Sequence, residues 1–235
     1  MTDLEQLRAE VLDANLALSA HGLVKLTWGN VSGVDRDRGL MAIKASGVDY
    51  EHMTTDDVVL VDLESGEVVT DPAHPERKPS TDTPTHQALY NAFDGIGGIV
   101  HTHSTWATAW AQAEREIPLL GTTHADLMAE AVPLTRQLTA EEVERDYEGE
   151  TGTVIIELIG DRVDELPAAL VRGHAPFCWA ATPAKAVEIA VTVEEVARLA
   201  LLTRVLSPDG GPLAEVLRDK HHQRKHGPNA YYGQS

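Results

Sequence analysis

The spacing of apolar residues along the chain changes between two periods, and each period predicts a different kind of element. Apolar residues at every third or fourth position predict helices, whereas short β-branched runs bounded by turn residues predict strands. Helices are expected at residues 2–20, 85–93, 106–113, 140–147, 183–206 and 213–225. Strands are expected at 23–34, 41–44, 58–61, 68–69, 154–159 and 168–171, and in the β-branched run that follows Gly97 and Gly98.

The stretches between these elements have the composition of turns and loops. Ser65-Gly66 separates two apolar runs, which is typical of a hairpin. Residues 70–81 are rich in proline and polar residues and are expected to form a loop, and residues 121–126 are expected to be a loop or the end of a strand. Because short strands alternate with helices at both ends of the chain, we expect an α/β domain with a mixed sheet.

Bulk composition narrows the class of protein. The 235 residues are 43% hydrophobic, enough to bury one sizeable core, and no linker-like tract divides them, so a single domain over residues 1–235 is expected. A formal net charge of −18 argues against a nucleic-acid partner, which requires a basic face. No apolar run approaches the length of a membrane span, and the single cysteine, Cys178, excludes an intrachain disulfide. These features favour a cytoplasmic protein with no membrane partner.

One segment is rich in basic residues, although the chain as a whole is acidic. Residues 218–226 include seven Arg, Lys or His side chains among nine positions. In the simplest interpretation they form a solvated helix end, where cations interact favourably with the helix dipole. The functional alternative is that this segment attracts an anionic substrate such as a sugar phosphate.

The candidate chemistry begins with His101 and His103, which follow the run Ile99-Val100. Side chains in a strand repeat every second residue, so both imidazoles are expected on the same face. Two neutral imidazoles so placed form half of a divalent transition-metal site, and a solvated strand face is the plainer alternative. His174 follows another apolar run and is either a third nitrogen ligand or a core or rim residue. Three protein ligands would leave one position open, which is the arrangement of catalytic zinc.

A metallo-hydrolase is one alternative for such a dyad. That class requires an Asp shortly after the second histidine, as in His-x-His-x-Asp-His, whereas Ser104-Thr105-Trp106 follows here. The sequence therefore does not support water activation of that kind.

Longer motifs surround the histidines and occur in order along nearly the whole chain. They occupy residues 26–32, 44–50, 78–86, 98–104, 121–126 and 224–234. Together these motifs resemble those of the L-ribulose-5-phosphate 4-epimerases in the class II aldolase superfamily. The resemblance implies a single three-layer αβα domain whose central mixed sheet is largely antiparallel. It also implies a cyclic homotetramer with active sites between subunits.

The resemblance further implies roles for individual residues. The metal, Zn²⁺ or in its place Mn²⁺ or Co²⁺, would be held by His101, His103, His174 and Asp82. The sugar phosphate would be bound by polar residues of several motifs, namely Asn30, Lys44, Ser46, Gly47, Ser80, Thr81 and His221. Asp126 and Tyr232 would form an acid/base pair, with Tyr232 supplied by a neighbouring subunit.

Several of these residues also have plainer interpretations. Gly29-Asn30 and Ser46-Gly47 are ordinary turn dipeptides, and Asp82 has the position of a helix cap. Asp126 alone would be a solvated loop carboxylate, and Tyr231-Tyr232 would be part of a packed tail. Only their joint occurrence favours a site.

The activity implied by the resemblance is the conversion of L-ribulose 5-phosphate to D-xylulose 5-phosphate by epimerisation at C4, as in arabinose use. No carbonyl lies next to C4, so simple deprotonation there is unfavourable. Cleavage of the C3–C4 bond avoids this problem, because the resulting enediolate is delocalised into the C2 carbonyl and would be stabilised by zinc as a Lewis acid. The aldehyde fragment then rotates and adds back through its other face, while Asp126 and Tyr232 transfer protons at the C4 oxygen.

Two alternatives use the same framework. A class II sugar-phosphate aldolase of the L-fuculose-phosphate type would use the same metal and enediolate, but such aldolases have a Glu where Asp82 stands here. A non-enzymatic domain like the adducin head would be expected to lack the metal-binding histidines. The chain departs from the epimerase pattern in three places: Thr81 replaces a second Ser, Ala175 replaces a Gly, and residues 71–77 lengthen a loop.

Overall fold

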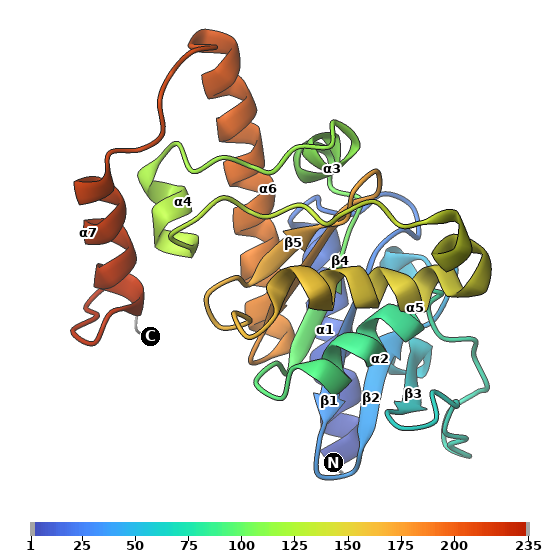
Figure 1. The fold of residues 1–235 in the computed structure, drawn as a ribbon. Helices are drawn as coiled ribbons and strands as arrows, with labels where there is room; N and C mark the ends of the chain where they lie inside the picture. Colours follow the sequence, from blue (N-terminus) through green and yellow to red (C-terminus); the bar gives the residue numbers. More distant parts are fainter. Residues whose placement is uncertain (1–2, 234–235) are drawn as a thin grey trace.

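A computed structural model describes residues 3–233 of the chain. A six-stranded antiparallel sheet lies at its centre (Figure 1). In spatial order the strands are β3 (Val58–Asp62), β2 (Leu40–Lys44), β1 (Asn30–Asp35), β4 (Gly98–His101), β6 (Pro176–Ala180) and β5 (Ala168–Leu170). Each strand runs antiparallel to its neighbours. Thr2 and Gln234, which belong to the first predicted helix and the last motif, lie outside the described residues.

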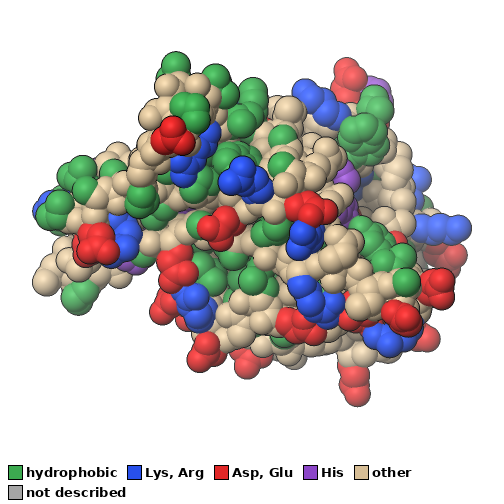
Figure 2. All heavy atoms as spheres, turned by 45° about the horizontal axis from the view of Figure 1, so that its top comes forward, with side chains coloured by type: hydrophobic (Ala, Val, Ile, Leu, Met, Phe, Trp, Pro, Cys, Tyr) green, Lys and Arg blue, Asp and Glu red, His purple; other side chains and the backbone are tan. Residues whose placement is uncertain are grey.

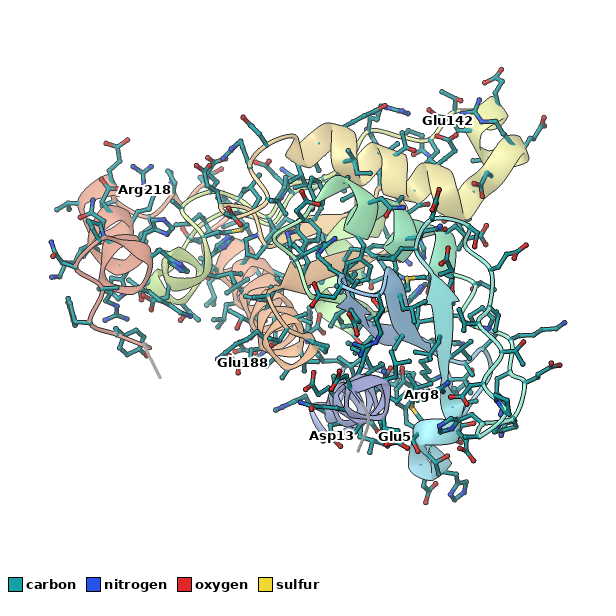
Figure 3. All side chains as sticks on the ribbon, turned by 90° about the horizontal axis from the view of Figure 1, so that it is seen from below. Glu5, Arg8, Asp13, Glu142, Glu188 and Arg218 are labelled. Atoms are coloured by element: carbon teal, nitrogen blue, oxygen red, sulfur yellow. The ribbon has the colours of Figure 1, made fainter. Side chains whose placement is uncertain are left out.

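Helices cover both faces of this sheet. In chain order they are α1 (Asp3–Ala20), α2 (Thr83–Ala92), α3 (Thr105–Gln112), α4 (Thr122–Leu127), α5 (Ala140–Ile159), α6 (Pro183–Leu206) and α7 (Glu215–His226), with 3₁₀ turns at Tyr50–His52 and Thr55–Asp57. Figure 3 shows α5, labelled at Glu142, on one side of the sheet, and α1 and α6, labelled at Asp13 and Glu188, on the other. The α2 helix packs against α5, and α1 packs against α6. The predicted three-layer αβα architecture is therefore confirmed.

Most of the predicted helices are confirmed. The described ends of α1, α2, α3, α6 and α7 lie within two residues of the expected ones. The long α6 begins where the Thr182 hydroxyl accepts a bond from the Lys185 N–H and Pro183 occupies the first turn. Among the described residues, no helix is both long enough and apolar enough to cross a bilayer.

Two segments that were expected to be strand or loop are helical. The prediction of a strand at 154–159 is wrong, because these residues belong to α5, where Val154, Ile155 and Ile159 are buried on one face. The prediction of a loop or strand end at 121–126 is wrong, because most of this segment belongs to α4, which packs against α6 and α7. In both cases contacts with distant helices outweigh the local signal.

The sheet also differs from the prediction in three respects. All pairs between the named strands are antiparallel, so the expected largely antiparallel sheet is confirmed and only its mixed character is wrong. The expected strand at 23–34 begins only at Asn30, after the turn at Gly29. The β6 strand was not predicted from the sequence, although its Cys178 is buried as expected.

The register of the three central strands determines where the chemistry lies. Asn30, the first residue of β1, stands opposite His101, the last residue of β4. His101 in turn stands opposite Phe177 of β6. This end of the sheet therefore brings together the start of β1, the end of β4 and the loop that joins β5 to β6.

Candidate metal centre and substrate cavity

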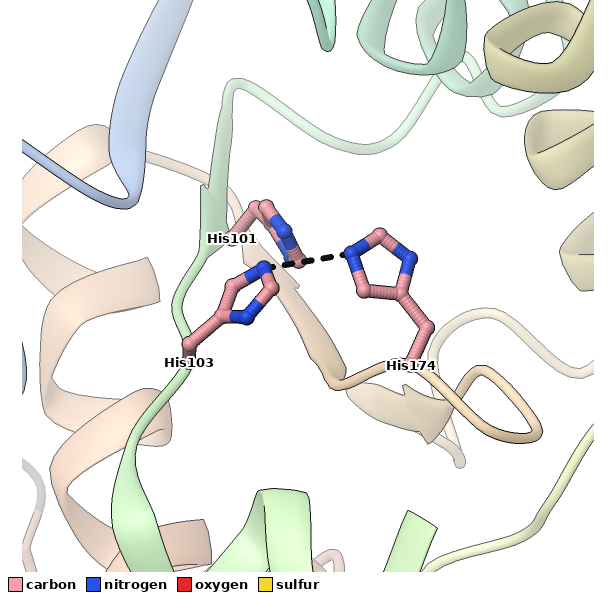
Figure 4. A group of neighbouring side chains, drawn as sticks. All are labelled: His101, His103 and His174. Atoms are coloured by element: carbon pink, nitrogen blue, oxygen red, sulfur yellow. Dashed lines mark hydrogen bonds between the residues drawn. The ribbon is translucent and has the colours of Figure 1, made fainter. Parts of the chain in front are cut away.

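Three histidines meet at this end of the sheet. His101 ends β4, His103 lies two residues further on, and His174 lies in the loop between β5 and β6. One ligand nitrogen from each ring lies within 4.8 Å of those of the other two, and the Nε2 atoms of His103 and His174 are 3.1 Å apart (Figure 4). The predicted grouping of the three imidazoles is therefore confirmed, even though β4 ends at His101.

The ring of His101 is held in an orientation that suits a metal ligand. Its Nδ1 lies 3.0 Å from the Pro176 carbonyl oxygen, which accepts only if Nδ1 carries the hydrogen. The ring also stacks on Phe177, with ring centroids 4.1 Å apart. The Nε2 lone pair of His101 is thus left for a metal. Zinc binds nitrogen at about 2.0–2.1 Å, which separates two tetrahedral ligands by about 3.3 Å, so the spacing of His103 and His174 fits this ion.

The protonation state of the histidines also favours metal binding. Burial, and then the neighbouring His101 and His103, lower the pKa of His174 to about 4. Burial, followed by the neighbouring His101, also lowers the pKa of His103. Both rings are therefore neutral near pH 7, which is the form that donates a lone pair to a metal.

Two neighbouring loop positions bear on the geometry of these ligands. Gly29 has a φ of 82°, and a Cβ there would lie 2.9 Å from the His101 carbonyl oxygen, so glycine alone fits this turn. Ala175, which departs from the epimerase pattern, is fully buried and its carbonyl accepts a bond from the Val171 N–H at 2.9 Å. His174 still joins the other two histidines, so the Ala175 departure does not displace the third imidazole.

A cavity of about 560 Å³ opens beside the histidines. It is lined by all four predicted metal-site residues and by most of the predicted phosphate-binding residues: His101, His103, His174 and Asp82, and Asn30, Lys44, Ser46, Gly47, Ser80 and Thr81. It is also lined by Thr27, Trp28, Gly29, Ala45, Tyr147 and Glu148. The motifs that lie far apart in sequence thus converge on one cavity.

Asp82 lies at the centre of a polar network in this cavity. Asn30 Nδ2 donates to Asp82 Oδ2 at 2.6 Å and to Ser80 Oγ at 3.0 Å. Burial raises the pKa of the Asp82 carboxyl, but His101, His86 and the bond from Asn30 outweigh burial and leave that pKa below its usual value.

Asp82 also stands at the N-cap position of α2, as expected if it only capped this helix. Its side chain, however, makes no capping bond. Among the described residues, the close group of ligand atoms contains the three imidazoles alone. A direct bond from Asp82 to the metal therefore stays a prediction.

Lys44 places a cation inside the same cavity wall. Its side chain is 2% exposed, and its Nζ has only long bonds of 3.4 Å to the carbonyl oxygens of Thr27 and Ala45. Burial lowers the pKa of Lys44 to about 8, although Asp57 and Asp49 oppose the shift. The ammonium is weakly satisfied by the protein and is therefore suited to an anionic ligand.

The predicted acid/base pair lies in a different place. The Asp126 carboxylate of α4 accepts bonds from Arg224 of α7 at 2.7 and 2.9 Å, and lies 3.3 Å from His221 Nδ1. The ring of Tyr232 lies 4.2 Å from the Arg224 guanidinium. Asp126, His221 and Tyr232 do not line the cavity of their own chain. Their roles toward a substrate thus remain predictions that require a second subunit.

Tyr147 and Glu148 are cavity residues that the sequence did not single out. The sequence predicted only that a short acidic helix ends at Tyr147, whereas α5 continues to Ile159 past a break at Asp146. Asp146 accepts a bond from the Gly149 N–H at the break, and this N-cap pattern is the local signal that could have found the two residues.

Comparison with known proteins settles the family. A model of the class II aldolase and adducin N-terminal domain matches residues 9–201, which is most of the chain. The chain belongs to this class II aldolase family. The superfamily predicted from the motifs is therefore confirmed.

Relatives of this class II aldolase family member are similar to it over nearly their full length. L-ribulose-5-phosphate 4-epimerase UlaF of Salmonella paratyphi A is 52% identical over 233 residues, covering 98% of this chain and 100% of that protein. A solved L-fuculose 1-phosphate aldolase has a TM-score of 0.76 at 24% identity and covers 93% of this chain and 95% of its own. The YgbL structure from Klebsiella pneumoniae, titled a putative aldolase/epimerase/decarboxylase, has a TM-score of 0.70 at 22% identity and covers 94% of this chain and 99% of its own. These structures confirm the class II aldolase fold.

Proposed function

We propose that this chain is a cytoplasmic, metal-dependent L-ribulose-5-phosphate 4-epimerase that forms D-xylulose 5-phosphate. The observation that carries the proposal is the convergence of three imidazoles and a polar, lysine-containing wall on one cavity. The 52% identity to relatives named L-ribulose-5-phosphate 4-epimerase supports the same substrate.

The proposed metal ligands are His101, His103 and His174, and Zn²⁺ is the expected ion, with Mn²⁺ or Co²⁺ as alternatives. A divalent ion held there would supply Lewis-acid stabilisation of negative charge on substrate oxygens. Asp82, fixed by Asn30, contributes a carboxylate beside the imidazoles and is proposed to approach the ion.

Other residues that line the cavity are proposed to hold the phosphate. Lys44 supplies a positive charge, and the hydroxyls of Ser46, Ser80 and Thr81 supply donors next to it. Thr81 keeps the hydroxyl of the serine that it replaces in the epimerase pattern. Firm binding of the phosphate would retain the aldehyde fragment while the C3–C4 bond is open.

The charge of Lys44 gives a prediction for pH. Since its pKa is about 8, the ammonium is present below that pH and is lost above it. Lys44→Met is expected to raise the KM for the sugar phosphate about 10- to 100-fold, the loss of one hydrogen bond to a charged group. In the parent protein KM should rise as pH passes through about 8, and in Lys44→Met this rise should disappear.

Steady-state kinetics between pH 6.5 and 9.5 measure this effect. Lys185→Met, which removes an exposed lysine on α6, serves as the matched control and should behave as the parent. Equal KM values for Lys44→Met and the parent at pH 7 would show that Lys44 does not bind the phosphate.

A homotetramer with shared active sites is proposed to bring the acid/base pair to the cavity. Apolar side chains are exposed near the end of α6 and on α7, at the left of Figure 2, where Val205, Leu206 and Val216 are 71%, 86% and 75% exposed. Exposed apolar groups of this kind are suited to cover by another subunit. Tyr232, half-exposed on the adjacent tail, would then face the cavity of a neighbour.

The alternative function is that of a class II sugar-phosphate aldolase. It is favoured by the solved L-fuculose 1-phosphate aldolase with the same fold. Product analysis separates the two functions when the zinc-loaded protein is given L-ribulose 5-phosphate. An epimerase should form D-xylulose 5-phosphate, whereas an aldolase should accumulate dihydroxyacetone and glycolaldehyde phosphate.

A further inference from the structure

Tyr147 reaches the cavity from a break inside α5. Asp146 has an extended backbone within the helix (φ −167°, ψ 82°), and its carboxylate accepts a bond from the Gly149 N–H at 3.2 Å. Asp146 therefore caps a second helical segment that starts at Tyr147. The Thr151 hydroxyl donates to the Tyr147 carbonyl at 2.8 Å. The backbone of Tyr147 is thus fixed at the rim of the cavity.

The Tyr147 hydroxyl contacts the outer nitrogen of a metal-ligand candidate. Its oxygen lies 3.1 Å from His174 Nδ1, while His174 Nε2 lies 3.1 Å from His103 Nε2. Because Nε2 faces the other imidazoles, it is the nitrogen that would bind a metal. Nδ1 must then carry the hydrogen and donate it to the Tyr147 oxygen, which leaves the phenol hydrogen of Tyr147 free to be donated elsewhere.

His101, like His174, has a partner for its Nδ1 nitrogen. His101 Nδ1 donates to the Pro176 carbonyl, which belongs to the backbone and cannot be removed by substitution. His174 obtains its acceptor from a side chain instead. A partner of this kind fixes the tautomer and the ring orientation of a metal-binding histidine.

We propose that Tyr147 is a positioning residue for the metal centre: its hydroxyl oxygen accepts the Nδ1 hydrogen of His174 and holds Nε2 toward the ion. This inference rests on the proposed metal-dependent function. Since Tyr147 also lines the cavity, its phenol hydrogen is available for a bond to an oxygen of the sugar phosphate.

Zinc affinity tests the proposal without reference to activity. Removal of such a partner typically costs about 10- to 100-fold in metal affinity, so Tyr147→Phe should raise the Kd for Zn²⁺ by that factor in competition with a chromophoric chelator. With Co²⁺ in place of Zn²⁺, the visible d–d absorption of Tyr147→Phe should also shift. Tyr231→Phe, which removes an exposed hydroxyl, should match the parent in both measurements.

The outcomes separate this inference from the proposed function. Parent-like Zn²⁺ affinity in Tyr147→Phe, together with loss of metal in His174→Ala, would overturn the role of Tyr147 and leave the metal centre intact. Parent-like Zn²⁺ binding in His174→Ala would overturn both. At saturating Zn²⁺, Tyr147→Phe should retain a raised KM, and a KM equal to that of the parent would overturn the bond to the sugar phosphate.

Discussion

His101→Ala is expected to lose the bound divalent ion and to lower the rate of epimerisation by about a thousandfold. The rate estimate follows because Lewis-acid stabilisation contributes several kcal/mol to the transition state, and roughly 4 kcal/mol corresponds to a factor of a thousand. His101 is buried and held by Pro176 and Phe177, so its replacement by alanine removes a proposed ligand whose position is fixed. Elemental analysis and initial rates measure the two effects.

His21→Ala is the matched control for this variant. His21 follows α1, is exposed to solvent and does not line the metal cavity. It should keep about one divalent ion per chain and the parent rate, as expected for a site with a single open zinc. A full complement of ion in His101→Ala would show that the three histidines are not the metal site.

Tyr232→Phe is expected to lower kcat by about 10²- to 10⁴-fold, the usual contribution of a general acid or base. Its content of metal should be unchanged, because Tyr232 does not line the cavity that holds the three histidines of its own chain. Tyr231→Phe, which alters the neighbouring ring, should keep kcat near that of the parent. Equal kcat values for the two variants would remove Tyr232 from the reaction.

Mixing of subunits tests whether the site is shared. If Tyr232 acts on the cavity of a neighbour, chains with Tyr232→Phe and chains with His101→Ala should restore part of the activity when they assemble together. Some mixed interfaces would then combine an intact cavity with an intact tyrosine. Absence of any recovery in mixed oligomers of verified composition would contradict a shared site.

The sequence predicted the grouping of the three histidines better than it predicted the surrounding fold. His101 and His103 could be placed together because they are two residues apart at the end of a strand, where geometry is local. The other cavity residues were assigned through long motifs, and Asn30, Lys44 and Ser80 line the same cavity as the histidines. These assignments did not depend on correct element boundaries.

The errors occurred where distant contacts decide the structure. The β-branched run at 154–159 favours a strand locally, but it forms the buried face of α5 against α2. Asp126 belongs to α4, which packs against α7, and its carboxylate binds Arg224 far along the chain. Tyr147 was missed for a different reason, because the N-cap pattern of Asp146 was assigned to a helix that ends at Tyr147.

The loop at residues 71–77, which is longer than in the epimerase pattern, is held in place by contacts with charged side chains. Asp71 pairs with Arg8 of α1 at 3.2 Å, and His74 contacts Asp56 at 2.7 Å. Arg77 pairs with Asp57 at 3.2 Å. The longer loop is therefore fixed to the body of the molecule before the chain enters the cavity at Ser80.

The fate of the C4 hydrogen in D₂O tests the proposed reaction most directly. Cleavage of the C3–C4 bond turns the C4 hydrogen into the aldehyde hydrogen of glycolaldehyde phosphate, which does not exchange with solvent. Zinc-loaded protein given L-ribulose 5-phosphate in D₂O should therefore yield D-xylulose 5-phosphate that retains hydrogen at C4, as read by proton NMR. Deuterium at C4, or no D-xylulose 5-phosphate at all, would contradict epimerisation by carbon–carbon bond cleavage.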